Sequence, residues 1–236
     1  MSYSKLAKRI RKPSLAGYFF GKFGRALPFV GKGCIFGISI FAQYAYPMAQ
    51  NPSPSETYTN PWQTESVREV YQNPWIRLTE AQVRNPAGNP GIYGVVHFKN
   101  KAIGIIPIDE EGYTYLVGQY RYPLEEYSWE IPMGGGPIAQ PILESAQREL
   151  QEETGLTAQR WELIMRIHTS NSVTDEEGFI FLAEGLTQGQ TAFEETEDLQ
   201  IKRLPLAEAV AMAMDGRITD SLSLAGLLKV ARLRGI

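Results

Sequence analysis

The chain has 236 residues, of which 43% are hydrophobic and 21% charged, the proportions of an ordinary globular protein. Its single cysteine, Cys34, excludes an intramolecular disulfide, and its two histidines, His97 and His168, exclude a histidine-rich metal site. Any bound metal must therefore be held mainly by oxygen atoms, which favour magnesium, manganese or calcium. The formal net charge of −3 argues against a nucleic-acid binder, because phosphate backbones require clustered positive charge.

The N-terminal segment differs in charge from the rest of the chain. Residues 1–55 hold eight basic side chains and no acidic one. An apolar run from Cys34 to Ala42 follows the last of them, as in a signal peptide or a membrane-surface segment. Lys32 interrupts the apolar part, however, and the run is far shorter than the roughly 20 residues that span a bilayer. We therefore expect a poorly ordered extension or an upstream start codon with initiation at Met48, and weak membrane association of residues 1–50 and export are the alternatives.

Pro, Ser, Thr and Asn dominate residues 47–64, a composition typical of a linker. We therefore divide the chain into an extension over residues 1–61 and one folded, cytoplasmic domain over residues 62–236. Runs of β-branched and apolar residues between turn signals predict the first strands of that domain at 76–83, 94–98, 102–108 and 113–122. Turns are expected between them at 85–91 and 109–112.

The second half of the chain mixes helices with strands. One helix is predicted over 141–154, followed by strands near 161–168, 178–183 and 200–204. Two helices end the chain: one over 206–214, and one that Asp220 caps and that runs to about residue 233. Strands first, a helix in the middle and helices last predict an α+β fold with a mixed sheet, of the α/β/α sandwich type.

Chemistry is concentrated in residues 134–156, where a glycine-rich segment precedes the middle helix. Three successive glycines free the backbone to approach a ligand closely, while Pro141 suits the first helical turn and Gly155 suits the position after the last. Within the helix one apolar stripe predicts the face that packs on the core, and it consists of Leu143, Ala146 and Leu150.

A stripe of glutamates lies beside the apolar one, at Glu149, Glu152 and Glu153. Like charges at this spacing repel one another, and the helix dipole disfavours anions near the C-terminal end. Local stability therefore does not explain the stripe. One interpretation is a solvated helix face, and the other is a set of carboxylates that divalent cations neutralise.

The spacing of this segment resembles the Nudix box: Gly, five residues, Glu, seven residues, then Arg-Glu-apolar-any-Glu-Glu-any-Gly-apolar. The positions that match in register are Gly134, Arg148, Glu149, Leu150, Glu152, Glu153, Gly155 and Leu156. The first glutamate of the box is replaced by Gln140. In the family that residue supports the loop–helix geometry, and Glu144 is one turn before Arg148, where it could pair with the arginine instead.

The resemblance covers roughly residues 66–236 and is greatest to ADP-ribose pyrophosphatase-type members. The segments that carry it outside the box are 119–122, 128–132, 169–177, 179–183, 195–199 and 216–228. It implies metal-dependent hydrolysis of the diphosphate bond in a nucleoside diphosphate linked to a sugar, with ADP-ribose cleaved to AMP and ribose 5-phosphate. A catalytically weakened domain that senses or binds a nucleotide sugar is the alternative, and Gln140 is the feature in its favour.

Site roles follow from the resemblance residue by residue. It implies that Mg²⁺ or Mn²⁺ is held by the carbonyl of Met133 and by Glu149, Glu152 and Glu153. Glu152 is also a catalytic candidate, Arg148 orients the glutamates by salt bridging, and Glu197 of the later acidic loop is the general base, with Glu195 as the reserve candidate. The substrate is contacted by Arg121, Gly134 and Gly135, although a surface salt bridge is the alternative for Arg121. The resemblance also implies a homodimer in which N-terminal strands cross between subunits.

Overall fold

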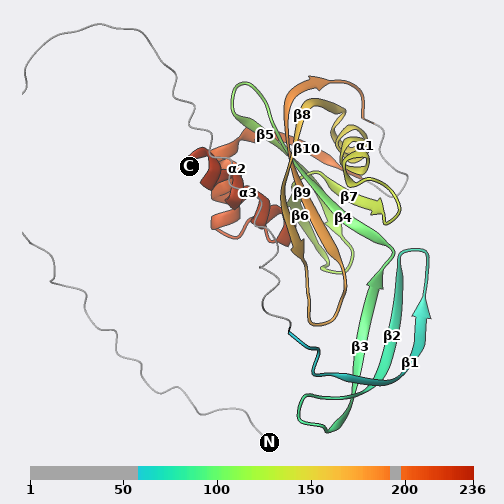
Figure 1. The fold of residues 1–236 in the computed structure, drawn as a ribbon. Helices are drawn as coiled ribbons and strands as arrows, with labels where there is room; N and C mark the ends of the chain where they lie inside the picture. Colours follow the sequence, from blue (N-terminus) through green and yellow to red (C-terminus); the bar gives the residue numbers. More distant parts are fainter. Residues whose placement is uncertain (1–57, 192–197) are drawn as a thin grey trace, which may run out of the picture. The chain divides into compact units, whose positions relative to one another are not determined.

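The computed structural model describes residues 58–191 and 198–236, which form two sheets and three helices (Figure 1). The predictions for residues 1–57, namely an extension with weak membrane association or a start at Met48, concern positions outside this part. No helix in the described ranges combines the length and the apolar character needed to cross a membrane.

A three-stranded antiparallel sheet comes first, in the order β1-β2-β3. Its strands are β1 (Gln63–Gln72), β2 (Ile76–Arg84) and β3 (Pro90–Phe98). The sequence analysis predicted β2 and part of β3 but wrongly treated the start of β1 as linker. All ten residues of β1 are exposed. Because neither face of β1 is buried, its sequence lacks the alternation of apolar and polar residues by which a strand is predicted.

A seven-stranded mixed sheet forms the centre of the domain, with β10-β5-β4-β9-β8 as its main path. Strand β6 pairs with β5, and β7 pairs with β4. β4 and β9 run parallel, and the other pairs run antiparallel. The strands are β4 (Asn100–Ile108), β5 (Tyr113–Arg121), β6 (Glu126–Glu130), β7 (Met133–Pro137), β8 (Leu156–His168), β9 (Glu177–Gln188) and β10 (Gln200–Pro205).

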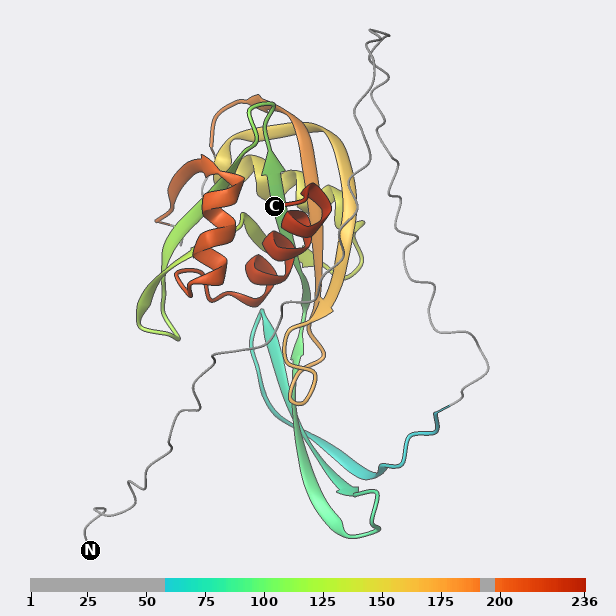
Figure 2. The same cartoon turned by 90° about the vertical axis from the view of Figure 1, so that its left-hand side faces the viewer.

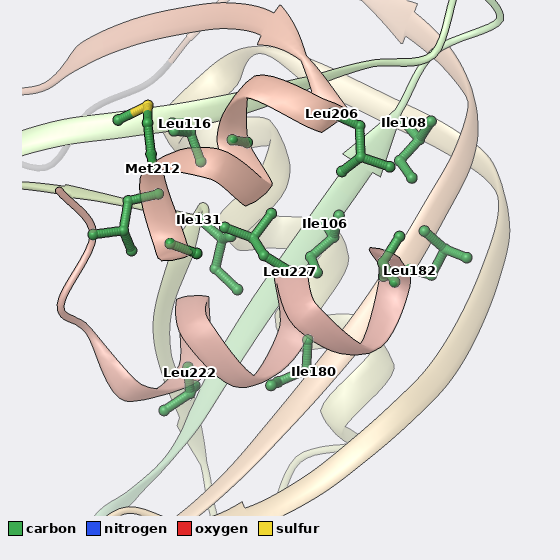
Figure 3. Close-up of a cluster of buried hydrophobic side chains, with 14 of the residues drawn as sticks. Ile106, Ile108, Leu116, Ile131, Ile180, Leu182, Leu206, Met212, Leu222 and Leu227 are labelled. Atoms are coloured by element: carbon green, nitrogen blue, oxygen red, sulfur yellow. The ribbon is translucent and has the colours of Figure 1, made fainter. Parts of the chain in front are cut away.

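Helices cover both faces of this sheet (Figures 1 and 2). Side chains of β4 alternate between the two faces. Ile103 and Ile105 belong to a buried cluster with α1 (Ile142–Thr154), whereas Ile106 belongs to a second cluster with α2 (Leu206–Met214) and α3 (Ser221–Arg234). Figure 3 shows this second cluster, in which Leu227 of α3 lies near Ile106. The layers confirm the predicted α+β sandwich.

Local signals place the helix ends. Gly155 takes a φ of 70° after α1, in the left-handed region where a side chain is strained, so the glycine ends the helix there. Asp220 caps α3 as predicted, because its carboxylate accepts a hydrogen bond from the Ser223 amide at 2.7 Å. Pro141 is the N-cap of α1 and lies just before the first helical turn.

The largest correction concerns the glycine-rich segment before α1, where no strand was predicted. Met133–Pro137 forms β7, and its partners in antiparallel register are residues 100–104 of β4. Glycine is disfavoured in strands on local grounds. Pairing with the central strand overrides that preference, and it holds the glycine backbone straight beneath α1.

Candidate active site

Glu149 and Glu153 project from α1 onto β7. Their exposed fractions are 6% and 1%, which is unusual for glutamate. Gly134 makes room for the first of them: a Cβ added at Gly134 would lie 2.2 Å from the Glu149 carboxyl carbon. Any side chain at position 134 would therefore displace this carboxylate. The match of Gly134 to the box has a steric cause in this structure.

Glu153 is tied to the same strand by a hydrogen bond. The Met133 amide donates to Glu153 Oε2 at 2.9 Å. A buried carboxylate that accepts a backbone hydrogen bond has a fixed position relative to the strand. The two buried glutamates, one turn apart, therefore fix α1 to both Met133 and Gly134.

Arg148 links three oxygen atoms around the helix. Its guanidinium donates to Glu152 Oε2 at 2.6 Å, to Glu149 Oε1 at 2.6 Å and to the Gly135 carbonyl at 2.9 Å. Burial by itself lowers the pKa of Arg148, but the charges and hydrogen bonds of Glu149 and Glu152 outweigh it and raise this pKa above its ordinary value. Arg148 therefore carries a permanent charge among the glutamates.

The substitution at the start of the box leaves this network intact. Gln140 lies exposed in the turn before α1, where its backbone N–H donates to the Pro137 carbonyl at 2.9 Å. Glu144 was considered as a residue that could pair with Arg148 in place of the missing glutamate. Among the described residues it makes no such ion pair, and Glu149, Glu152 and the Gly135 carbonyl take that place.

The donor set suits a hard divalent cation. Glu149 and Glu153 of α1 lie against the glycine strand, and Arg148 holds Glu152 beside them. Oxygen ligands of this kind are those that Mg²⁺ and Mn²⁺ prefer. Within residues 58–191 and 198–236, no three Asp, Glu, His or Cys side chains converge on one point. In this structure the guanidinium of Arg148 supplies the positive charge between Glu149 and Glu152 instead.

Arg121 lies on β5 against the adjoining strand β6. Its Nε donates to Glu130 Oε1 at 2.9 Å and its Nη2 to Glu130 Oε2, which makes a two-pronged ion pair. Glu130 is 3% exposed. Its hydrogen bond raises the pKa of Arg121, and the more distant charges of Asp220 and Glu153 act in the same direction. Arg121 thus lies within electrostatic range of the glutamate helix, but two of its donors already serve Glu130.

A cavity of about 300 Å³ opens beside this ion pair. The β5–β6 hairpin and the start of α3 line it together, and the lining residues are Arg121, Pro123, Leu124, Ser128, Glu130, Thr219 and Asp220. The sequence analysis considered Asp220 only as a helix cap and missed Ser128 and Thr219. The one local signal for Ser128 is its position two residues before Glu130, since alternate residues of a strand share a face.

The proposed general base Glu197 and its reserve Glu195 lie in residues 192–197, outside the described residues, so their role stays a prediction.

His97 connects β3 with the segment after β8. Its Nδ1 lies 2.5 Å from Asp175 Oδ2, and its Nε2 lies 2.9 Å from the Thr79 hydroxyl.

Comparison with known proteins gives this fold and site a family. Residues 62–96 match the model of the nucleoside diphosphate sugar hydrolase N-terminal domain, and residues 99–222, more than half of the chain, match the model of the NUDIX domain. The chain belongs to the Nudix hydrolase family, whose members typically depend on a divalent metal. It is a diphosphatase of the kind that hydrolyses nucleoside diphosphate sugars.

Several individual proteins are similar to this chain in sequence or in structure. An ADP-ribose pyrophosphatase of Mycobacterium tuberculosis is 35% identical over 65% of this chain and 75% of its own length. An ADP-ribose pyrophosphatase of Bacillus subtilis is 31% identical over 51% of this chain and 66% of its own. A methanol dehydrogenase activator of Bacillus methanolicus is 32% identical over 62% of this chain and 80% of its own length. The crystal structure of an ADP compounds hydrolase shares the fold, with a TM-score of 0.68 at 21% sequence identity. The superposition covers 76% of this chain and 98% of the hydrolase chain.

Proposed function

We propose that this enzyme cleaves ADP-ribose to AMP and ribose 5-phosphate with Mg²⁺ or Mn²⁺. The observation that carries the proposal is the pair of buried carboxylates, Glu149 and Glu153, held against the glycine strand β7. Two relatives above 30% identity are ADP-ribose pyrophosphatases, which supports this substrate over other nucleotide sugars.

In this proposal the metal is held by Glu149, Glu152 and Glu153 of α1 together with the carbonyl of Met133. A divalent metal supplies neutralisation of the diphosphate oxygens and a lower pKa for bound water. Arg148 keeps the glutamates oriented, because its guanidinium spans Glu149 and Glu152 and is anchored to the backbone at Gly135.

The reaction is a displacement at one phosphorus of the diphosphate. Water forms the new P–O bond as the bridging P–O bond breaks, and the proton of the water passes to a carboxylate, for which Glu197 is the first candidate and Glu195 the second. Gly134 and Gly135 leave the backbone of β7 accessible to the phosphates. The remaining donors of Arg121 face the substrate from the neighbouring strand.

A homodimer built on the N-terminal sheet belongs to the same proposal. β1 is an edge strand, and it is exposed along its whole length although it carries Val67, Val70 and Tyr71. An edge strand with such side chains tends to pair with another chain. Light scattering on the purified chain is expected to give twice the monomer mass, and Val67→Lys with Val70→Lys is expected to give the monomer.

The test of the activity is release of phosphate in a coupled phosphatase assay on the full chain with Mg²⁺ or Mn²⁺. The panel comprises ADP-ribose, ADP-glucose, GDP-mannose, UDP-glucose, NADH and diadenosine polyphosphates. We expect preferential cleavage of ADP-ribose that EDTA abolishes. Faster cleavage of another nucleotide sugar would correct the substrate and leave the diphosphatase chemistry in place.

The alternative of a weakened domain that only binds a nucleotide sugar rests on Gln140. The network around Arg148 argues against it, since three oxygen partners hold that arginine without any contribution from Gln140. If the folded chain cleaved no member of the panel, the binding function would replace the catalytic one. Thermal shifts produced by the same ligands would then identify what it binds.

A further inference from the structure

The cavity between the β5–β6 hairpin and the start of α3 has walls that are bonded to each other. Ser223 of α3 accepts a hydrogen bond at its hydroxyl from the Ile131 amide at 3.0 Å, and the same hydroxyl donates to Asp220 at 2.8 Å. The residue that follows β6 and the cap of α3 are therefore joined. A cavity with connected walls keeps its shape without a ligand, as small-molecule sites usually do.

One hydroxyl in the lining has no hydrogen-bond partner among the described residues. Ser128 is 7% exposed and shares a strand face with Glu130, and no other described residue forms a hydrogen bond with its side chain. A hydroxyl on a cavity wall that no protein group uses is open to a molecule bound in the cavity. Its position there makes Ser128 a hydrogen-bonding group for such a molecule.

The charges of the lining decide which molecule fits. One guanidinium, Arg121, faces two carboxylates, Glu130 and Asp220. Since Glu130 already neutralises Arg121, the second carboxylate leaves the cavity with an excess negative charge. A phosphate group would be repelled there, whereas an uncharged group that both donates and accepts hydrogen bonds would not be.

The remaining groups suit the hydroxyls of a sugar ring. Asp220 Oδ2 is used by Ser223, but Oδ1 has no hydrogen-bond partner among the described residues and can accept from a hydroxyl. Thr219 adds a hydroxyl of its own at the rim. Pro123 and Leu124 add an apolar surface to the lining, on which the C–H face of a sugar can pack.

The geometry points to this cavity as the subsite for the sugar that is linked to the nucleoside diphosphate. The inference rests on the proposed function and deepens it: Ser128, Thr219 and Asp220 select the sugar half, while α1 and β7 act on the diphosphate beside it. Arg121 joins the two parts, because it lines the cavity and lies within electrostatic range of Glu153.

The test measures binding by calorimetry on the full chain in the presence of Mg²⁺. The two probes are α,β-methylene ADP-ribose, which carries the second sugar, and ADP, which does not. Ser128→Ala is expected to weaken binding of the first probe about fivefold, the loss of one hydrogen bond, and to leave binding of ADP unchanged. Thr219→Val, at the exposed rim, is expected to act in the same direction, so that a poorly folding Ser128 variant would not end the test.

A matched control is Thr114→Val, which removes a hydroxyl away from the cavity, at the opposite end of β5. It is expected to change neither affinity. Equal weakening of both probes by Ser128→Ala would mean that the cavity holds the diphosphate, and no change for either probe in the Ser128 and Thr219 variants would mean that the sugar lies elsewhere. Either result would overturn the sugar subsite, whereas the proposed function would still hold if the wild-type enzyme cleaved ADP-ribose. A wild-type chain that neither cleaves ADP-ribose nor binds its analogue would overturn the proposed function and the subsite together.

Discussion

The carboxylate of Glu149 occupies the space that a side chain at Gly134 would need, with 2.2 Å between the Glu149 carboxyl carbon and an added Cβ. The next two glycines of β7 are crowded in the same way. A Cβ at Gly135 would lie 2.8 Å from the Asn100 amide nitrogen, and one at Gly136 would lie 2.9 Å from the Ser145 hydroxyl. A side chain at any of the three would need a neighbour to move. The Asn100 side chain is exposed and can do so, whereas Gly134 faces a buried charge.

We predict that Gly134→Ala removes most of the activity. The added methyl group must push Glu149 off β7 or lift α1 from the sheet, at a cost of about 1–3 kcal/mol in stability. The measurement is kcat/KM for ADP-ribose together with the melting temperature. Gly94→Ala is the matched control, because no heavy atom lies within 4 Å of a Cβ at that strand position. Full activity in Gly134→Ala would contradict the placement of Glu149 in the site.

Glu153→Gln is predicted to abolish most turnover while the fold survives. The glutamine oxygen can still accept the hydrogen bond from the Met133 amide, but the negative charge is lost. Circular dichroism and kcat measured side by side separate these two effects. Glu144→Gln is the control on the same helix, since Glu144 is exposed and makes no ion pair among the described residues. Turnover within a few-fold of wild type in Glu153→Gln would remove Glu153 from the metal ligands.

The helices could be predicted from the sequence because their signals are local. The boundaries of α1 follow from Pro141 and Gly155, and the start of α3 follows from Asp220. The register of the box also gave the positions of the residues that meet on β7. Strand β7 itself was missed, because glycine disfavours strands and the pairing partner of β7 is about thirty residues earlier in the chain.

The cavity shows the kind of feature that could not be predicted. Ser128 and Asp220 are far apart in sequence, and only packing of α3 against the β5–β6 hairpin brings them into one lining. Arg121 was predicted to contact substrate, and its ion pair with Glu130 depends on a cross-strand register that residue types alone do not fix. Site residues that lie within one segment could be predicted from the sequence. Site residues that packing brings together from several segments could not.

We predict that Asp109 makes stability depend on pH in the acid range. Burial by itself raises the pKa of this carboxyl, but hydrogen bonds from the Tyr113 amide, Arg203 and the Glu111 amide outweigh burial and hold the pKa below its ordinary value. A depressed folded-state pKa stabilises the protein above the unfolded pKa, about 3.9, and the contribution is lost as pH falls through the lower folded value.

The comparison for this prediction is Asp109→Asn, studied by urea unfolding at pH 6 and pH 3. The wild type is expected to be more stable than the variant by up to about 1 kcal/mol at pH 6, and the difference is expected to shrink at pH 3. Glu110→Gln in the same turn is the control, since the Glu110 side chain makes none of these hydrogen bonds. A difference that stayed constant between the two pH values would show that Asp109 acts only through the shape of the turn.

His97→Ala is predicted to loosen the segment after β8 without unfolding the domain. His97 connects Asp175 to Thr79, and Asp175 in turn accepts a hydrogen bond from the Phe98 amide at 3.2 Å. Without the imidazole, this segment keeps its other bonds to β3, such as the 2.8 Å bond from the Tyr93 hydroxyl to the Ser172 carbonyl and the 2.9 Å bond from the Val96 amide to the Val173 carbonyl. Loss of roughly 1 kcal/mol of local stability gives about fivefold faster amide exchange.

Hydrogen exchange followed by mass spectrometry measures this effect on peptides that cover residues 93–98 and 170–177. Faster exchange is expected in both peptides, whereas exchange in α3 should match the wild type, because α3 takes no part in the His97 contacts. His168→Ala is the matched control, since His168 is exposed and makes no side-chain hydrogen bond within the described residues. If exchange rose equally across the whole domain, His97 would contribute to global stability, and its bond to Asp175 would not stabilise only the segment after β8.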